Sequence, residues 1–577
     1  MVDYLIKNGW IIDGKGTDAF KGDVAIAEGR IKKIGNLGEV SAKKVIDATG
    51  KWTTPGFIDM HSHADTSIFL FPDCQSYLMQ GITTFYGGTC GDSNAPLNHY
   101  WMRKYWEYDM WHEIDPFIYY PETIQPVEKV RQVVFDKTGV WIDWQTFGQY
   151  LDKVESTGLG VNMIPVLGHS QLRADVMGKN GNRPPTVEEM RQMEKHIEEA
   201  MESGAWGISF GRDYPPSAYG EEDELLALLK KVKERKGSFS IHWRRTGTRN
   251  QYARKANKLE GVVEALELAL KSGVKMQLSH LDTGFDIFPS NGRLETLAAE
   301  ETLAVLDDYV EKGVDFAFDV IPGTSGGIVH VPYLAGYLMP WLKQSGSMKN
   351  FHENLKCRDY RTKLMDHLRA GHWYNINPKL DPEWDLKIKI ISSKESDFVN
   401  CSIREISNTM GCDSVEGALR VLLEDTRVMV QKEGKRMEGV KRLLEHPKGT
   451  VCTDTFAFDE KGLYGLEGEI PEILPHPHTY CAFPKYINQL AGPRREEAIR
   501  KTTGLPASIL GFKDRGLIQE GYHADVLVLD FNALKTNENY IETRRYSEGI
   551  THVFVNGGLA VSDSQLTGCR KGKVLRK

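Results

Sequence analysis

His61 and His63 are separated by one residue and follow the apolar run GFIDM. In extended backbone, side chains two residues apart project from the same side of the chain, so both imidazoles could bind one metal ion. Two further histidines, His242 and His280, end the separate apolar runs SFSIH and VKMQLSH. A core histidine needs a buried polar partner for each ring nitrogen, which makes histidines at strand ends unusual as core residues. These residue types and spacings therefore predict one shared metal site.

A cysteine and an aspartate complete this set. Cys90 lies among glycines in YGGTCGDS, after the run ITTFYGG, and Asp454 ends the run GTVCTD. Taken alone, Cys90 is more often an inert small residue, and Asp454 could cap a helix. Zinc, however, binds imidazole, thiolate and carboxylate, and a catalytic zinc site keeps one position open for water. The combined set predicts a zinc hydrolase in which metal-bound hydroxide attacks a carbonyl and Asp454 acts as general base, then general acid.

The chain contains eight apolar runs, and five of them carry or precede these residues. They alternate with helical patterns, which is typical of βα units and a parallel sheet. One helix is indicated by the capping box Thr186 to Glu189, and its C-terminal cap is expected at Gly204. Eight parallel strands with intervening helices predict an α/β fold, a (β/α)8 TIM barrel, with catalytic groups at the carboxyl ends of the strands. The predicted strands are 56–60, 82–88, 161–167, 205–210, 238–242, 274–280, 314–320 and 449–454.

Both ends of the chain contain short strands separated by turns. Neither end offers enough strands for a core of its own, so residues 1–54 and 501–577 are expected to pair into one small β-sandwich. Residues 55–500 form the predicted barrel domain, with insertions near 89–145 and 321–448, the second largely helical. The first contains the aromatic-rich run WMRKYWEYDMWHEIDPFIYY, which could be a satellite core, a lid or a dimer contact. The sequence therefore leaves open whether the protein forms a homo-oligomer.

Composition and charge exclude several classes of protein. The chain of 577 residues has a formal net charge of −7, so it offers no basic field for a nucleic acid. No apolar run approaches the about 18 residues that span a bilayer, and the first residues do not form a signal peptide. The eight cysteines are scattered without a CxxC pair, which is not typical of a disulfide framework. We expect a cytoplasmic enzyme with a small-molecule substrate, and neither a membrane nor a nucleic acid as partner.

An ordered series of motifs resembles the amidohydrolase superfamily, specifically its N-acyl-D-amino-acid deacylase branch. The motifs are GFIDMHSHAD, QGITTFYGGTCGDSNAP, VLGHSQLRADVMG, GISFGRDYPPSAY, SIHWR, LSH, TD and TTGLPASILGFKDRGLIQEGYHADVLVLD. The resemblance implies a TIM barrel with a β-sandwich, one or two zinc ions, and Asp454 as catalytic acid and base. It implies that Cys90, His242 and His280 hold zinc tightly, whereas His61 and His63 serve a second, weaker position shared through the cysteine. The segment GISFGRDYPP has no lysine to bridge two metals, consistent with the cysteine in that role.

Three positions depart from the family pattern. Typical relatives hold the substrate carboxylate with a lysine after the sixth-strand histidine, a tyrosine in YPYT and an arginine in HPR. Here the corresponding segments read HLD at 280–282, DVIPGT at 319–324 and HPH at 476–478. Each charge-assisted hydrogen bond is worth about 1.5–3 kcal/mol, so losing this clamp would weaken carboxylate binding severely. We therefore expect a neutral substrate that contacts His478, Asp282 or Arg212.

Other residues of the family's motifs could border the same pocket. His169 and Arg173 lie in GHSQLR, where a packing role is an equal alternative. A neutral, cyclic carbonyl substrate favours C–C ring opening of a cyclic 1,3-dione, as in dihydrophloroglucinol cyclohydrolases. The alternatives are an N-acyl-D-amino-acid deacylase, another C–N amide hydrolase, and a non-catalytic barrel that serves as a binding scaffold.

Overall fold

A computed structural model describes residues 1–102, 121, 123–245, 258–325, 329–330, 334–371, 381–460, 474–540 and 542–577. Each of the eight predicted parallel strands is present at its expected place. They are β6 (Phe57–Asp59), β7 (Ile82–Gly87), β10 with β11 (Asn162–Pro165 and Leu167–Gly168), β12 (Gly207–Gly211), β13 (Ser238–His242), β14 (Lys275–Leu278), β15 (Phe316–Val320) and β19 (Gly449–Val451).

These strands form two parallel sheets. One has the order β10-β7-β6, and the other has the order β11-β12-β13-β14-β15-β19. Only Val166 separates β10 from β11, so the chain passes directly from one sheet into the other. At the far end of the series, backbone hydrogen bonds join the residues that follow β19 and β6, from Asp454 N–H to His61 O (3.0 Å) and from His63 N–H to Thr455 O (2.9 Å). The strand ends that carry the candidate ligands therefore meet.

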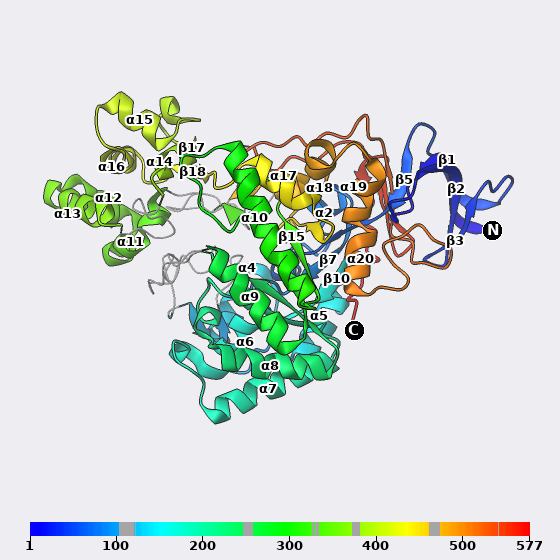
Figure 1. Ribbon diagram of the computed structural model, residues 1–577, viewed down its shortest axis with the longest axis horizontal. Coiled ribbons are helices and arrows are strands. Elements are labelled where there is room, and N and C mark those ends of the chain that lie inside the picture. The colour runs from blue at the N-terminus through cyan, green and yellow to red at the C-terminus, as the bar shows by residue number, and fades with distance from the viewer. Residues whose placement is uncertain are drawn as a thin grey trace.

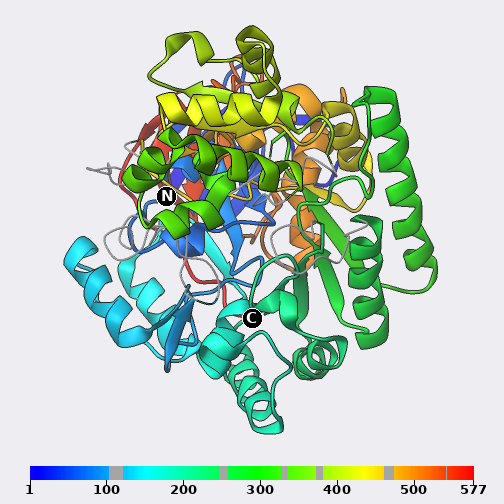
Figure 2. The same cartoon turned by 90° about the vertical axis from the view of Figure 1, so that its left-hand side faces the viewer.

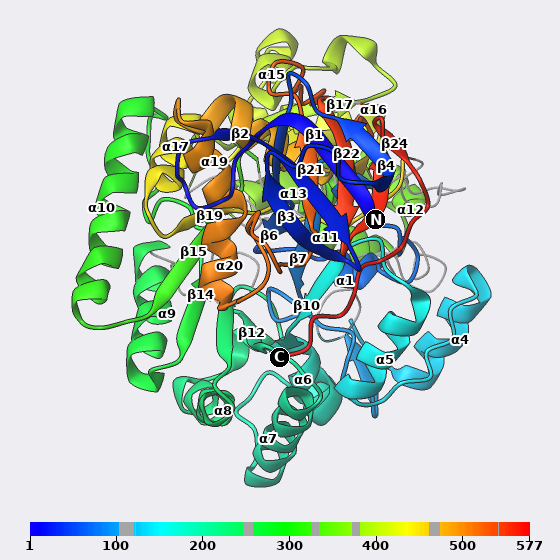
Figure 3. The ribbon, with the colours of Figure 1, turned by 90° about the vertical axis from the view of Figure 1, so that its right-hand side faces the viewer.

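Helices cover the outer side of the parallel strands. The predicted capping box is confirmed, because Thr186 and Glu189 bond reciprocally at the start of α7 (Val187–Glu202), and Gly204 follows this helix with φ +107°. Figure 3 shows α9 (Lys258–Ser272) and α10 (Gly292–Glu311) outside β14 and β15. Every residue of β7, β12 and β15 is buried, as expected for parallel strands covered on both faces. The structure is thus a mixed α/β fold.

The two chain ends share one sheet, as predicted. Its nine strands run in the order β24-β23-β22-β21-β5-β1-β2-β3, with β4 also paired to β1. The strands form one continuous sheet and not two separate ones. An isolated β-bridge joins Arg30, at the start of β3, to His523, and the residues of this sheet pack around an apolar core of their own. The strands are β1 (Val2–Ile11), β2 (Phe20–Ala27), β3 (Arg30–Gly35), β4 (Ala42–Asp47), β5 (Trp52–Pro55), β21 (Val526–Leu529), β22 (Ile550–Val555), β23 (Gly558–Ser562) and β24 (Gln565–Leu566).

The second predicted insertion is largely helical and has a core of its own. Figures 1 and 2 show this unit at one end of the molecule, opposite the sheet of the chain ends. Its elements are α11 (Met339–Ser345), α12 (Met348–Lys356), α13 (Arg358–Arg369), α14 (Trp384–Lys387), α15 (Ile403–Met410), α16 (Ser414–Glu424) and the antiparallel pair of β17 (Ile388–Ser392) and β18 (Met429–Lys432). The next helix, α17 (Met437–Glu445), packs against α10 and leads into β19.

The first insertion contains β8 (Tyr100–Met102) paired with β9 (Ile124–Pro126), followed by α4 (Val127–Thr138). Most of its aromatic-rich run, residues 103–120, lies outside the described residues. The predicted role of this run as a satellite core, a lid or a dimer contact therefore stays a prediction. Within the part of the chain that the structure covers, no helix is long and apolar enough to cross a bilayer.

Candidate metal centre

The strand ends place three candidate residues in unusual backbone conformations. Cys90, His280 and Asp454 have φ angles of 56°, 35° and 52°, in the left-handed region that residues other than glycine rarely adopt. Such strain costs about 1–3 kcal/mol per residue and collects at functional sites. The fold therefore holds these side chains in place at an energetic cost.

The thiol of Cys90 lies at the centre of three imidazoles. Its Sγ atom is 3.3 Å from His61 Nε2, 3.4 Å from His242 Nδ1 and 3.5 Å from His280 Nε2. Asp454 Oδ1 lies 3.3 Å from both His61 Nε2 and His63 Nε2. His61, Cys90, His280 and Asp454 each offer one ligand atom within 4.8 Å of the others, and all four are buried. The structure thus brings all six residues of the predicted set together.

These separations fit a bound cation. Zn–S and Zn–N bonds of about 2.3 and 2.0–2.1 Å in tetrahedral geometry would place sulfur and nitrogen about 3.6 Å apart. Burial lowers the pKa of His280 well below its usual value, helped by the charge of Arg245, so the ring is neutral, as a metal ligand must be. Burial, Asp454 and Asp92 raise the pKa of the Cys90 thiol, whereas a coordinated metal would deprotonate it. The donor set therefore fits a divalent metal.

Two buried carboxylates position the strand ends that carry these ligands. Asp319 on β15 accepts hydrogen bonds from His280 N–H (2.6 Å) and Gln277 Nε2 (2.7 Å). Asp59 on β6 accepts the backbone N–H groups of His61 (3.2 Å) and Thr453 (3.1 Å). The sequence predicted neither role. The only available signal was an aspartate inside an otherwise apolar strand, where it must find buried partners.

A third aspartate supports His242. Asp213 Oδ2 lies 3.3 Å from His242 Nε2, the ring nitrogen that faces away from Cys90. Its carboxylate also accepts the backbone N–H of Arg245 at 3.1 Å. A carboxylate on the outer nitrogen of a ligating histidine fixes the orientation of the ring and makes the inner nitrogen more basic.

His169 and Arg173, predicted to border the pocket, take part in a buried network. His169 Nε2 lies 2.8 Å from Glu224 Oε1, and its Nδ1 lies 2.8 Å from Ser217 Oγ. Arg173 bonds both oxygens of Glu224 and also donates to the carbonyl oxygens of Gly181 and Arg183 at 2.8 Å. Protein groups therefore occupy both nitrogens of His169 and both terminal nitrogens of Arg173, and their contact with substrate remains a prediction.

Arg212 has a similar environment. Its guanidinium bonds Glu264 at 2.8 Å and the carbonyl oxygens of Ser217 and Gly220 at 2.9 and 3.0 Å. Its predicted role at the substrate also remains a prediction, because these contacts engage its terminal nitrogens.

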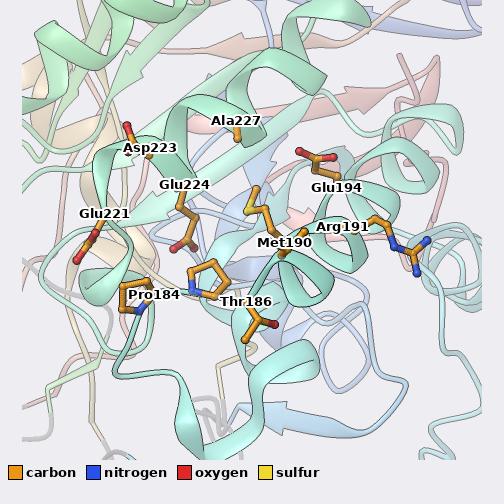
Figure 4. Close-up of a pocket in the computed structure, with 11 residues that line it drawn as sticks. Pro184, Thr186, Met190, Arg191, Glu194, Glu221, Asp223, Glu224 and Ala227 are labelled. Carbon is orange, nitrogen blue, oxygen red and sulfur yellow. The ribbon is translucent and has the colours of Figure 1, made fainter.

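A hollow of about 580 Å³ lies at the outer side of this network. It runs between α7 and α8 (Glu222–Glu234), with Glu224, Met190 and Pro184 among its lining residues (Figure 4). Cys90 and the five residues gathered around it are not among its lining residues. This hollow is therefore separate from the candidate metal centre.

The other two predicted substrate contacts lie after the sixth strand and at the start of α18 (His478–Lys485). His478 is buried, with its ring 4.2 Å from that of His476. Burial raises the pKa of Asp282, but the charges of Lys435, Lys258 and Arg245 lower it overall. The acidic Asp282 is thus accompanied by three cations. The sequence did not predict them, because Lys435 lies far from Asp282 along the chain.

Comparison with known proteins adds an independent finding. A sequence model described as the Amidohydrolase family matches residues 44–272 and 473–561, more than half of the chain. D-aminoacylase and N-acyl-D-glutamate deacylase of Alcaligenes xylosoxydans xylosoxydans are each 26% identical to it over 581 residues, covering 100% of this chain and 98% and 97% of theirs.

The structural comparison agrees. N-acyl-D-glutamate deacylase from Bordetella bronchiseptica, solved with zinc and a phosphonate mimic of the tetrahedral intermediate, is similar with a TM-score of 0.68 and 25% identity over 100% of both chains. A crystal structure of D-aminoacylase, at 24% identity and a TM-score of 0.70 over 100% of both chains, shares the fold.

Proposed function

Because this chain belongs to the amidohydrolase family and is a metal-dependent hydrolase, we propose that it cleaves the C–N amide bond of an N-acylated amino acid. The observation that carries this proposal is the buried cluster of Cys90, histidines and Asp454 at the strand ends. Similarity over the whole chain to curated D-aminoacylase, N-acyl-D-glutamate deacylase and N-acyl-D-aspartate deacylase supports the substrate class.

The two parallel sheets are, in this proposal, parts of one (β/α)8 barrel. The strands neighbour one another in chain order, and the chain crosses between the sheets through Val166 alone. The hydrogen bond from Asp454 N–H to His61 O links the last strand end to the first. A barrel of this kind carries its catalytic groups at the carboxyl ends of the strands, where this cluster lies.

Zinc is the proposed metal, which Cys90, His242 and His280 would hold as one set of ligands, with His61 and His63 as a second set. When bound, zinc supplies Lewis acidity toward the substrate carbonyl and toward water. The proposal covers one or two ions, because Cys90 Sγ lies within 3.5 Å of histidines from both sets.

Asp454 moves the proton. Burial raises the pKa of Asp454, but the contacts with His61 and His63 outweigh burial and hold this pKa well below its usual value. The carboxylate is therefore ionised at neutral pH and can accept a proton at Oδ1 while water attacks the substrate carbonyl. The protonated carboxyl then donates this proton to the departing nitrogen, which breaks the C–N bond and releases a carboxylic acid and an amine.

Ring opening of a neutral 1,3-dione has less support than amide hydrolysis. The comparisons favour the deacylase alternative, and they give no support to cyclohydrolase specificity. The expectation of a neutral substrate depended on three missing clamp residues, but Lys435, Lys258 and Arg245 supply positive charge near Asp282. A non-catalytic scaffold is also disfavoured, because the structure brings together every predicted ligand and Asp454.

The proposal is tested with zinc-loaded protein and a panel of N-acetyl-D-amino acids, their L enantiomers and dihydrophloroglucinol. We expect release of free amino acids, measured by amine derivatisation, and no ring opening. Asp454→Asn protein prepared in parallel is the control for contaminating hydrolases. Turnover of dihydrophloroglucinol with no release of any amino acid would contradict the proposal.

A further inference from the structure

Lys435 lies between the inserted helical unit and helix α17. The backbone N–H groups of Gly434 and Lys435 both donate to Thr324 O, at 3.0 and 2.9 Å. Thr324 follows β15, the strand whose Asp319 positions His280. The base of this side chain is therefore fixed at the same end of the parallel strands as the candidate metal centre.

The ammonium group of Lys435 is buried and has no hydrogen-bond partner among the described residues. A buried polar group without a partner is costly, and a charged one more so. Other buried lysines of this chain are paired: Lys501 donates to His446 O (2.6 Å) and Gly449 O (3.1 Å), and Lys485 donates to Glu538 (2.6 Å). Within the described part of the chain, Lys435 thus lacks the kind of partner that Lys501 and Lys485 have.

The charges that act on Lys435 are those of residues around the candidate metal centre. The charges of Asp282 and Asp454 both act on its ammonium group, as does that of Arg245. Arg245 in turn acts on Cys90 and His280. No carboxylate of the described residues forms an ion pair with Lys435 within 4.0 Å, and Asp282 Oδ1 instead accepts the N–H of Thr283 at 2.8 Å.

We propose that Lys435 binds the carboxylate of the N-acylated amino acid and is the residue that selects for this group. A bound carboxylate would give the buried ammonium group its missing charge-assisted hydrogen bond. This inference deepens the proposed function and rests on it. It also assigns specificity to the residues that follow the inserted unit, and not to position 282, where an aspartate could not bind an anion.

The test compares each N-acetyl-amino acid with its carboxamide, in which a neutral group replaces the carboxylate. In zinc-loaded wild-type protein we expect the acid to have the higher kcat/KM for release of the acetyl group. Lys435→Met should lower the ratio of acid to carboxamide kcat/KM by about 10- to 100-fold, mainly through KM for the acid, and Lys435→Arg should restore much of it. The ratio is measured on one protein sample, so a partly unfolded variant does not distort it.

Lys501→Met is the matched control. It removes another buried lysine, one that bonds main-chain carbonyls, and should leave the ratio unchanged. An unchanged ratio in Lys435→Met, or an equal loss in Lys501→Met, would overturn the assignment. If the wild-type protein releases no amino acid at all, the proposed function fails by that result alone.

A binding measurement tests Lys435 without turnover. N-acetyl-D-methionine is titrated calorimetrically into zinc-loaded Asp454→Asn protein and into the same protein with Lys435→Met added. We expect binding to weaken by about 10- to 100-fold on removal of the lysine. Equal affinity in the two proteins, or no binding to the parent, would refute the proposed carboxylate site.

Discussion

Glu224→Gln tests whether the buried network of His169 and Arg173 stabilises the fold or acts on substrate. Burial raises the pKa of Glu224, but His169 and Arg173 bring it down to about 2 from an ordinary value of 4.5. A tenfold change in proton affinity is worth about 1.36 kcal/mol, so the ionised carboxylate contributes about 3 kcal/mol of stability at pH 7. Removing the charge should cost about this much, because Arg173 would stay buried without an anionic partner.

The sign of the pH dependence follows from the lowered pKa. A carboxylate with a lower pKa in the folded state stabilises the protein above its unfolded pKa of about 4.5, and this stability is lost as the pH falls toward 2. Glutamine does not titrate. The difference in unfolding free energy between wild-type and Glu224→Gln protein should therefore be about 3 kcal/mol at pH 7 and about 2 kcal/mol at pH 3.5.

Urea unfolding of the metal-free proteins, followed by tryptophan fluorescence at both pH values, measures this difference. Glu222→Gln is the matched control, since Glu222 lies on the same helix but pairs with Lys271 at the surface, and it should change stability by less than about 0.5 kcal/mol. We expect kcat/KM of zinc-loaded Glu224→Gln to stay within a few fold of wild type. Unchanged stability together with a large loss of activity would show that His169 and Arg173 act on substrate, and would refute this reasoning.

Two further substitutions separate catalysis from metal binding. Asp454→Asn should lower kcat by about 100- to 10,000-fold, because the proposed role of Asp454 is proton transfer. Its zinc content, measured by elemental analysis, should stay near that of wild type. Loss of zinc together with activity would contradict the proton-transfer role. Asp319→Asn should weaken zinc binding about 10- to 100-fold in a chelator competition, because the amide cannot accept from both His280 N–H and Gln277. The exposed Asp315→Asn, just before the same strand, is the control, and equal zinc affinity in all three proteins would refute the positioning role of Asp319.

The strands could be predicted because buried parallel strands read as short apolar runs between helical patterns. This signal placed all eight strands, and the turn signals at both chain ends placed the shared sheet. The candidate ligands could also be predicted, because histidine, cysteine and aspartate at strand ends are uncommon without a function. His61, Cys90, His280 and Asp454 do lie together in the structure.

The supporting residues could not be predicted in the same way. Asp59 and Asp319 lie within apolar strands, where periodicity gives no information on which backbone N–H an aspartate accepts. Lys435 follows β18, which pairs with the distant strand β17, and its backbone bonds to Thr324 O are likewise tertiary contacts between distant parts of the chain. The expectation of a neutral substrate considered only positions next to the ligands, and the comparisons favour the deacylase alternative over it.

The central claim is that Cys90 and the strand-end histidines bind at least one divalent cation through sulfur and nitrogen. X-ray absorption spectroscopy at the zinc edge of the zinc-loaded protein measures these bonds directly. We expect one sulfur neighbour at about 2.3 Å with nitrogen or oxygen neighbours at about 2.0–2.1 Å, and loss of the sulfur signal in Cys90→Ala. A zinc environment without sulfur in the wild-type protein, or one that Cys90→Ala leaves unchanged, would contradict it.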